Sequence, residues 1–584
     1  MKKSTVNILA SLVFATLILT SCGGLNKMVK MAPMVKYEVT PKVLEMHGDS
    51  VEVTVKVSFP SKYFQKKAVL EIIPVLKYEG GEKSFKSLTL QGEAIQANNQ
   101  VVTFVSGGTY SVSSKIAFEE GMRQGTLVAR VKATMGKTVG ELPEAKLADG
   151  TMATALLLEK DPMPIAADDK FVRVSTDSKD ATINFVINES TILGKELKKE
   201  EIKALQDFVA TSVAKGNVEF KGVEISAYAS PDGTEELNTK LSQNRLKNSE
   251  QYFVREMKKS KVAGMENEGF LLSKATPEDW EGFKKLMQES DIQDKELILR
   301  VLSMYSDPVV REKEIKNIAA AYEVIAEKIL PQLRRSKLIV NIAIVGYSDE
   351  ELKTLSVSNP DTLKVEELMY AASLATDLDT KLAIYQKVAS KFADDWRGHN
   401  NVGYIYLKQG KVAEAKASLL EAKRLDASNT MVLNNLGVVA FLEGDIVAAQ
   451  EFYNAAAGAG NQVSYNQALL PAKKGEYEKA LNLFVSSKYN TFNFALVKLL
   501  NYSITKNTDT YDAALGILSK VENQDVAKVY YLKAILGARK QDADMLMNNL
   551  RTAIEKDGAL KEYAKKDIEF AQYVNDATYK GIVE

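Results

Sequence analysis

The chain has 584 residues and carries 76 basic and 76 acidic side chains, so its formal net charge at pH 7 is zero. This balance provides no broad basic field for nucleic acid and no acidic excess that would favour disorder. The length corresponds to about three or four domains of ordinary size. The single cysteine excludes an intramolecular disulfide and any metal site built from several cysteines.

The first 21 residues have the features of an export signal. Lys2 and Lys3 give a positive start, and the apolar stretch that follows, of about a dozen residues, is too short to cross a bilayer as a helix. It ends in Leu19-Thr20-Ser21-Cys22, which resembles the lipobox of bacterial lipoproteins. That resemblance implies cleavage before Cys22 and lipidation of Cys22, and we expect no cofactor besides this covalent lipid.

The residues after Cys22 bear on location. In lipoproteins of this kind, an aspartate beside the cysteine retains the protein at the inner membrane, and a run of acidic residues directs some to the cell surface. Residues 23–27 have neither feature. We therefore expect lipid anchoring at the outer membrane, facing the periplasm, with residues 22–36 as a tether. The alternative is a surface-exposed lipoprotein that captures glycan or peptide.

Residues 37–160 show the period-two pattern of β-strands. Apolar and polar residues alternate from Val51 to Phe59, as in a strand with one buried face. Such short strands, separated by turn signals such as Gly80-Gly81, predict an all-β sandwich. No convergent polar set marks a site, so a spacer or docking module is the default interpretation. The further strand-like runs are 68–78, 101–105, 110–118 and 126–133.

Two connecting segments are expected on either side of the next domain. Residues 161–170 contain Pro162 and Pro164, and proline fits poorly into helices and sheets, so this stretch is predicted to be a linker. Residues 347–360 are predicted to be the second linker.

Residues 171–346 mix strand and helix patterns, with strands at 183–187 and 223–226 around a helix at 196–213. After the second strand, Ser230-Pro231-Asp232-Gly233, Asn238 and Leu241-Ser242-Gln243-Asn244-Arg245 follow in order. This order resembles the peptidoglycan-binding OmpA-like domain, whose motif has Gly-His-Thr-Asp, Gly, Asn and then Leu-Ser-x-x-Arg-Ala. The resemblance implies a central α+β domain. A helical insertion, about residues 254–333, departs from the family pattern.

The resemblance also implies a ligand. The family binds the zwitterionic diaminopimelate group of peptidoglycan, with an aspartate on its ammonium and an arginine on its carboxylate, a charge-assisted pairing. Arg245 corresponds to that arginine and Asn238 to the motif asparagine, whereas Ser230 replaces the aspartate and Asp232 lies two positions later. Three interpretations stay open: peptidoglycan binding, a different ligand or docked protein on the same fold, or a merely solvated Arg245.

Residues 361–584 have helical periodicity and repeat themselves. Gly403 recurs as Gly437 and Ala415 as Ala449, 34 residues apart in each case. This resembles the tetratricopeptide repeat, and predicts an α-solenoid with a terminal capping helix whose groove holds protein partners. By helix position, the candidate partner-binding residues are Asn401, Tyr404, Lys408, Asn434 and Asn435, with ordinary surface residues as the alternative reading of each.

Catalysis finds little support in the sequence. The two histidines, His47 and His399, lie in different predicted domains, and no phosphate loop, nucleophile elbow or zinc motif is present. We therefore expect no enzyme, no catalytic residues and no metal. The predicted function is a periplasm-facing outer-membrane lipoprotein that tethers to peptidoglycan and scaffolds partner proteins of an outer-membrane assembly or secretion complex, without nucleic acid.

Overall fold

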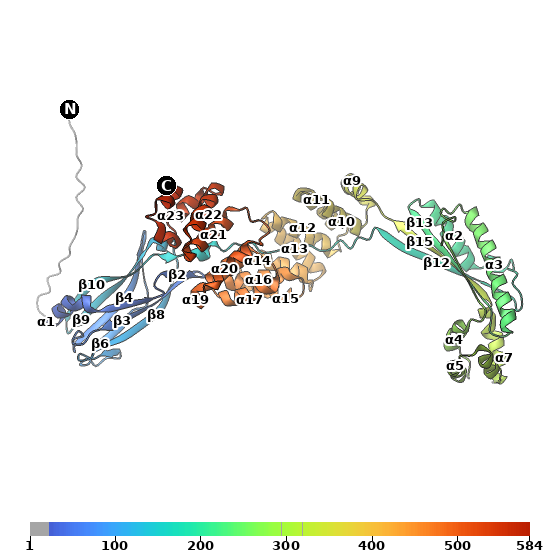
Figure 1. Ribbon diagram of the computed structural model, residues 1–584, viewed down its shortest axis with the longest axis horizontal. Helices are drawn as coiled ribbons and strands as arrows, with labels where there is room; N and C mark the ends of the chain where they lie inside the picture. The colour runs from blue at the N-terminus through green and yellow to red at the C-terminus, as the bar shows by residue number, and fades with distance from the viewer. Residues whose placement is uncertain (1–22, 294, 318) are drawn as a thin grey trace, which may run out of the picture. The chain divides into compact units, whose positions relative to one another are not determined.

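The computed structural model describes residues 23–293, 295–317 and 319–584 (Figure 1). The predicted signal and the lipidation site Cys22 lie outside the described residues. The chain divides into two compact units, one of residues up to Ala167 together with Phe392–Glu584, the other of Asp168–Lys391. Across the described ranges, every helix is too short or too polar to cross a membrane.

The first unit begins with two packed β-sheets. In β3 (Ser50–Phe59), Val51, Val53, Val55, Val57 and Phe59 are buried, because alternate side chains point to the same face. One sheet has the order β1 (Lys36–Thr40), β3, β2 (Leu44–His47), β11 (Thr151–Met152), with β8 (Gly108–Ala117) also on β3. The other has the order β10 (Thr138–Asp149), β9 (Thr126–Met135), β4 (Ala68–Tyr78), β6 (Leu88–Gly92), β7 (Gln100–Val102), with β5 (Gly81–Ser84) also on β4.

The segment expected to be a tether, residues 22–36, contains a helix. In α1 (Gly23–Met31), Leu25 and Met28 are almost fully buried in the sandwich core. These two side chains lie three positions apart, so they share one helix face. The chain is therefore fastened to the sandwich directly after Cys22.

The C-terminal part of the first unit is a series of antiparallel helical hairpins. A Cβ added to Gly403 would lie 2.6 Å from Cγ of Leu419, and one added to Gly437 would lie 2.5 Å from Cε1 of Tyr453. Glycine is thus needed where the two helices of a hairpin touch. The hairpins are α12 (Trp396–Lys408) with α13 (Val412–Leu425), α14 (Thr430–Glu443) with α15 (Ile446–Ala455), α16 (Asn461–Lys473) with α17 (Tyr477–Ser487), α18 (Phe492–Leu500) with α20 (Asp509–Leu518), and α21 (Ala527–Lys540) with α22 (Ala543–Lys556).

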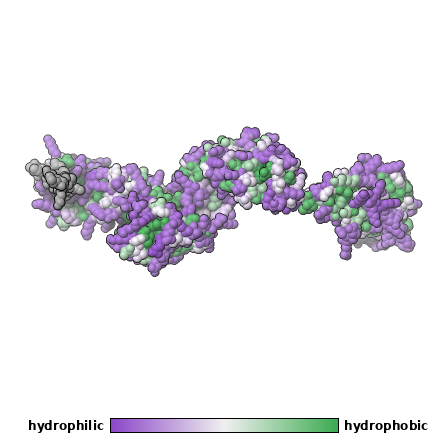
Figure 2. Space-filling view, turned by 90° about the horizontal axis from the view of Figure 1, so that it is seen from above, coloured by the Kyte–Doolittle hydropathy of each residue, from purple (hydrophilic) through white to green (hydrophobic). Residues whose placement is uncertain are grey.

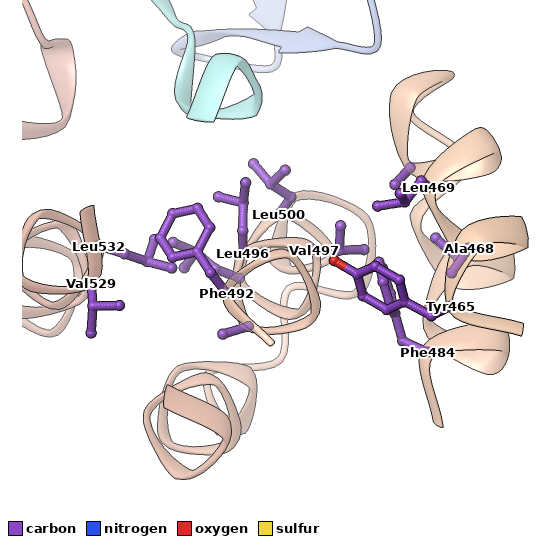
Figure 3. Close-up of a cluster of buried hydrophobic side chains, with 14 of the residues drawn as sticks. Tyr465, Ala468, Leu469, Phe484, Phe492, Leu496, Val497, Leu500, Val529 and Leu532 are labelled. Carbon is purple, nitrogen blue, oxygen red and sulfur yellow. The ribbon is translucent and has the colours of Figure 1, made fainter. Parts of the chain in front are cut away.

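Neighbouring hairpins share one continuous apolar core, as a solenoid requires. Figure 3 shows side chains of α16, α17, α18 and α21 meeting in it, among them Tyr465, Phe484, Phe492, Val497 and Leu532. Short helices follow the last long hairpin, at α23 (Ala559–Lys565) and α24 (Ala577–Val583), and Tyr579 and Val583 of α24 are buried. The predicted solenoid and its helical cap are present in this part of the chain.

The second unit contains a four-stranded mixed sheet in the order β12 (Val174–Asn184), β15 (Arg335–Val345), β13 (Val218–Tyr228), β14 (Leu271–Thr276). Leu338, Val340 and Ile342 of β15 face one side, where α2 (Glu200–Ala214) and α3 (Glu235–Lys259) cover them (Figure 1). The result is an α+β domain with a single apolar layer between sheet and helices.

The insertion differs in part from its prediction. The insertion begins later than residue 254, because α3 runs to Lys259, and it is not wholly helical, because it contains β14, which pairs in parallel with β13. Among the described residues that follow β14, five helices have an apolar core of their own that includes Phe283 and Ile298. Asp279 and Asp307 cap the first and third of them. The helices are α4 (Trp280–Glu289), α5 (Lys295–Met304), α6 (Pro308–Lys316), α7 (Ala319–Lys328) and α8 (Leu330–Leu333).

Three helices complete the second unit: α9 (Asp349–Ser358), α10 (Val365–Leu374) and α11 (Leu378–Lys391). The predicted linker 347–360 therefore consists largely of α9. Ser348 and Glu351 form a capping box at the start of this helix. The ring of Phe171 stacks on Tyr370 of α10 at 4.6 Å between centroids. The predicted solenoid 361–584 thus starts with a hairpin that belongs to the second unit.

Candidate functional site

Four asparagine side chains of the solenoid hold an extended segment of the same chain, residues 159–167. They come from the first helix of four successive hairpins, α12, α14, α16 and α18. Each carboxamide oxygen accepts a hydrogen bond from a backbone N–H at 2.6–2.8 Å, and each carboxamide nitrogen donates to the carbonyl oxygen of the same residue at 2.7–3.1 Å. The pairs are Asn401 with Ala167, Asn435 with Ile165, Asn466 with Met163, and Asn493 with Glu159.

Two further asparagines complete this network. Asn434 donates to the carbonyl oxygen of Met163 at 3.1 Å, and Asn400 donates to that of Ile165 at 3.2 Å. Asn435 in turn donates to the carboxamide oxygen of Asn400 at 3.0 Å, which links adjacent hairpins. All of these asparagines are fully buried. A buried polar network whose groups are paired is rigid, because breaking any member leaves its partners without a hydrogen bond.

The composition of the segment fits this arrangement. The paired residues 163, 165 and 167 alternate with Pro162, Pro164 and Ala166, so both prolines fall where no asparagine requires an N–H. Proline also favours an extended backbone. Ile165 is 8% exposed and belongs to the apolar core of the solenoid, against which Met163 also packs. The predicted linker 161–170 is therefore, as far as Ala167, an ordered ligand of the solenoid groove.

Asp161 adds a titratable group to the segment. One of its carboxylate oxygens accepts hydrogen bonds from Tyr465 Oη at 2.7 Å and Asn493 Nδ2 at 2.6 Å. Burial, and to a smaller extent the negative charge of Glu159, raise the pKa of Asp161 to about 6, while the hydrogen bond from Tyr465 and the weaker effect of Lys528 act in the opposite direction. Because the folded-state pKa is raised, the favourable contribution of Asp161 to stability is present below its ordinary pKa and is lost as pH rises through about 6.

Asp161→Asn is expected to stabilise the first unit at pH 8 by about 3 kcal/mol, because the pKa of Asp161 is raised from 3.8 to about 6 and each pKa unit corresponds to about 1.4 kcal/mol. The amide oxygen still accepts both hydrogen bonds, and the buried charge is gone. Urea unfolding at pH 8 and pH 4 measures the effect, and the gain should vanish at pH 4. Asp544→Asn, at an exposed position of α22, is the control. A variant that is less stable than wild type at pH 8 would contradict the assignment.

The β-sandwich is fastened to the same solenoid just before the segment begins. Thr154 donates a hydrogen bond to Glu569, whose carboxylate also pairs with Arg539 through Nε at 2.8 Å. At another contact, a Cβ added to Gly475 would lie 2.8 Å from the backbone nitrogen of Gly48. The extended segment is thus held at its start by a docked domain and along its length by asparagines.

Three of the five predicted groove residues line the groove, namely Asn401, Asn434 and Asn435. Tyr404 and Lys408 lie on α12, where the Lys408 ammonium is 5.8 Å from the Tyr404 ring centre. Three further asparagines of the groove were not predicted from the sequence, namely Asn400, Asn466 and Asn493. For Asn400, the available signal was the recurrence of the pair Asn400-Asn401 as Asn434-Asn435 at the 34-residue spacing.

Arg245 in the α+β domain is 1% exposed. Its guanidinium donates to three backbone carbonyl oxygens, those of Glu189 at 3.0 Å, Tyr228 at 2.9 Å and Val186 at 3.4 Å. Burial, and then the neighbouring charge of Arg334, lower the pKa of Arg245 to about 10, so the group stays charged at neutral pH. Arg245 therefore links the segment after β12 to the end of β13 and is closed off from solvent.

The other predicted site residues of this domain lie close together. Arg334 pairs with Asp232 through Nη2 at 2.8 Å and donates from Nε to Ser230 Oγ at 3.1 Å. Asn238 is 2% exposed and donates to the carbonyl oxygen of Gly233 at 3.1 Å. The motif residues therefore form an internal network. The carboxylate and guanidinium groups that would bind a zwitterion are already paired inside the protein.

The two histidines have separate surroundings. His47 Nε2 is 3.5 Å from a carboxylate oxygen of Glu45, and His399 Nε2 is 3.3 Å from the carbonyl oxygen of Ala393. In the part of the chain that the structure describes, no three His, Cys, Asp or Glu side chains are grouped so that they could hold a metal ion. On the visible face, hydrophilic residues dominate and hydrophobic ones form small patches (Figure 2).

The comparisons with known proteins concern the repeats. The model of the tetratricopeptide repeat family matches residues 397–429. No curated protein matches the chain. Solved structures that are similar include pilF of Pseudomonas aeruginosa (14% identity, 38% of this chain and 96% of that chain, TM-score 0.28) and a tetratricopeptide repeat protein of Parabacteroides merdae (13%, 49% and 99%, TM-score 0.26). Another is YrrB, described as having an unusual peptide-binding site (17%, 38% and 100%, TM-score 0.21).

The C-terminal part of the chain therefore contains tetratricopeptide repeats, a class of solenoid that serves protein–protein interaction.

Proposed function

We propose that this protein is a lipid-anchored scaffold at the periplasmic face of the outer membrane, which holds partner proteins of an assembly or secretion complex and has no catalytic role. The observation that carries the proposal is the asparagine-lined groove of the repeats, which binds an extended main chain. Asparagine carboxamides that pair with backbone groups give affinity for any extended segment, as strand addition does. The lipobox at Leu19–Cys22 supports the anchor.

For the α+β domain we propose protein docking rather than a wall tether. The motif order supports an OmpA-like fold, and the mixed sheet with α2 and α3 on one face agrees with the α+β architecture that the resemblance implies. The hydrogen bonds of Arg245 to three carbonyl oxygens and the Asp232–Arg334 pair argue against binding of diaminopimelate by these residues. A ligand would have to break buried pairs that cost several kcal/mol to separate.

A soluble form that lacks Cys22 is expected to stay in the supernatant when it is centrifuged with purified peptidoglycan sacculi. Ser230→Asp, which restores the acidic residue of the family motif, serves as the matched variant. Pelleting of the wild type would contradict the docking role and restore the wall tether.

In a second experiment, protease is added to intact cells, and the solenoid is expected to survive. Digestion of the solenoid on whole cells would favour the surface-exposed capture protein instead.

A further inference from the structure

The groove that makes the repeats suitable for a partner is filled by the chain itself. We propose that residues 159–167 are an intramolecular ligand that closes the repeat groove, and that a partner protein inserts an extended segment there by displacing them. This inference rests on the proposed scaffold function, because it names the kind of partner that the groove accepts and the step that precedes its binding.

The contacts of the segment show which features a competing segment needs. The four asparagine pairs reach only backbone N–H and C=O groups, so they do not depend on the side chains that are bound. Selectivity among segments comes from the apolar core of the solenoid, which surrounds Ile165 and packs against Met163. It also comes from the hydrogen bonds that Tyr465 and Asn493 donate to Asp161. The partner segment therefore has a hydrogen-bond acceptor followed by apolar residues two and four positions later, with proline tolerated between them.

Covalent attachment decides which segment occupies the groove at rest. A ligand on the same chain competes at an effective concentration of about millimolar or more. A free peptide with the same contacts, present at micromolar concentration, is therefore excluded. The ion pair of Lys528 with Glu159 and the docked sandwich favour the intramolecular ligand further. Displacement then requires a partner that also touches a second surface, which makes recognition bipartite.

The test uses the full soluble chain without Cys22 and a fluorescent synthetic peptide of residues 157–169. Ile165→Glu places a charge in the apolar core of the solenoid. It should therefore release the segment from the groove, while the groove asparagines themselves are unchanged. Fluorescence anisotropy is expected to show peptide binding at least tenfold tighter for Ile165→Glu than for the wild type. Ile165→Val keeps the segment apolar and should behave as the wild type. Addition of Asn435→Ala to Ile165→Glu should abolish the gain.

Two outcomes would overturn the proposal. Equal peptide binding by wild type and Ile165→Glu would mean that the groove is open, and absence of binding by a folded Ile165→Glu chain would mean that it takes no peptide. If Ile165→Glu fails to fold, trypsin on the wild type decides, since cleavage after Lys160 as fast as in the denatured chain contradicts closure. If the opened groove binds peptide but captures no more cell protein than the wild type does, the scaffold function fails and the closure stands.

Discussion

Arg245→Ala is expected to lower the free energy of unfolding of the α+β domain by about 3–5 kcal/mol. The substitution leaves the carbonyl oxygens of Val186, Tyr228 and Glu189 without their donor and opens a cavity beside Phe185, whose ring centre is 5.1 Å from the guanidinium carbon. Each buried polar group that loses its partner costs about 1–3 kcal/mol. Urea unfolding of the full soluble chain, followed by probes in this domain, measures the loss.

The control for this prediction is Arg255→Ala, on the exposed face of the same helix α3. It should change stability by no more than about 0.5 kcal/mol, as surface substitutions usually do. If Arg245 were instead a surface residue that binds a ligand, Arg245→Ala would change the free energy of unfolding as little as Arg255→Ala does. That result would contradict the structural role assigned to the arginine.

Asn435→Ala is expected to destabilise the first unit by about 2–4 kcal/mol. Asn435 is fully buried and makes both hydrogen bonds to Ile165 at 2.7 Å, so its removal leaves the Ile165 N–H without an acceptor. The link to Asn400 in the preceding hairpin is lost as well. Thermal unfolding of the full soluble chain measures the loss.

Asn482→Ala is the matched control, because Asn482 is an exposed residue of α17. It should leave the melting temperature within about a degree or two of the wild type. A similar small effect of Asn435→Ala would mean that the segment does not lie against the solenoid groove in solution.

Much of the secondary structure could be predicted because its periodicity is strong. The 34-residue recurrence located the repeats, and the small residues Gly403 and Gly437 occupy the tight contacts between helices. Alternation from Val51 to Phe59 located β3. Strands such as β5 and β11 are only four and two residues long, so they leave no periodic signal. Helix α9 was missed because most of its residues are polar and give little apolar periodicity, although the capping box of Ser348 and Glu351 marks its start.

The sites were harder to predict because burial depends on distant parts of the chain. Arg245 has the motif position of a ligand-binding arginine, but its partner Tyr228 and its neighbour Arg334 come from separate elements of the domain. The groove asparagines pair with residues 234 to 334 positions away in sequence. Pro162 and Pro164 disfavour helix and sheet, which is compatible both with a loose linker and with a bound extended segment. Only the packing against the solenoid distinguishes the two.

Hydrogen exchange of the backbone amides of Met163, Ile165 and Ala167 in the wild-type soluble chain tests the central claim most directly. Each of these amides donates to a buried carboxamide oxygen, so exchange should be slowed as strongly as in the solenoid helices. In Asn435→Ala, exchange at Ile165 should accelerate. Exchange of all three amides at the rate of an unstructured peptide would contradict the account, because it would mean that the groove is empty and the segment is a free linker.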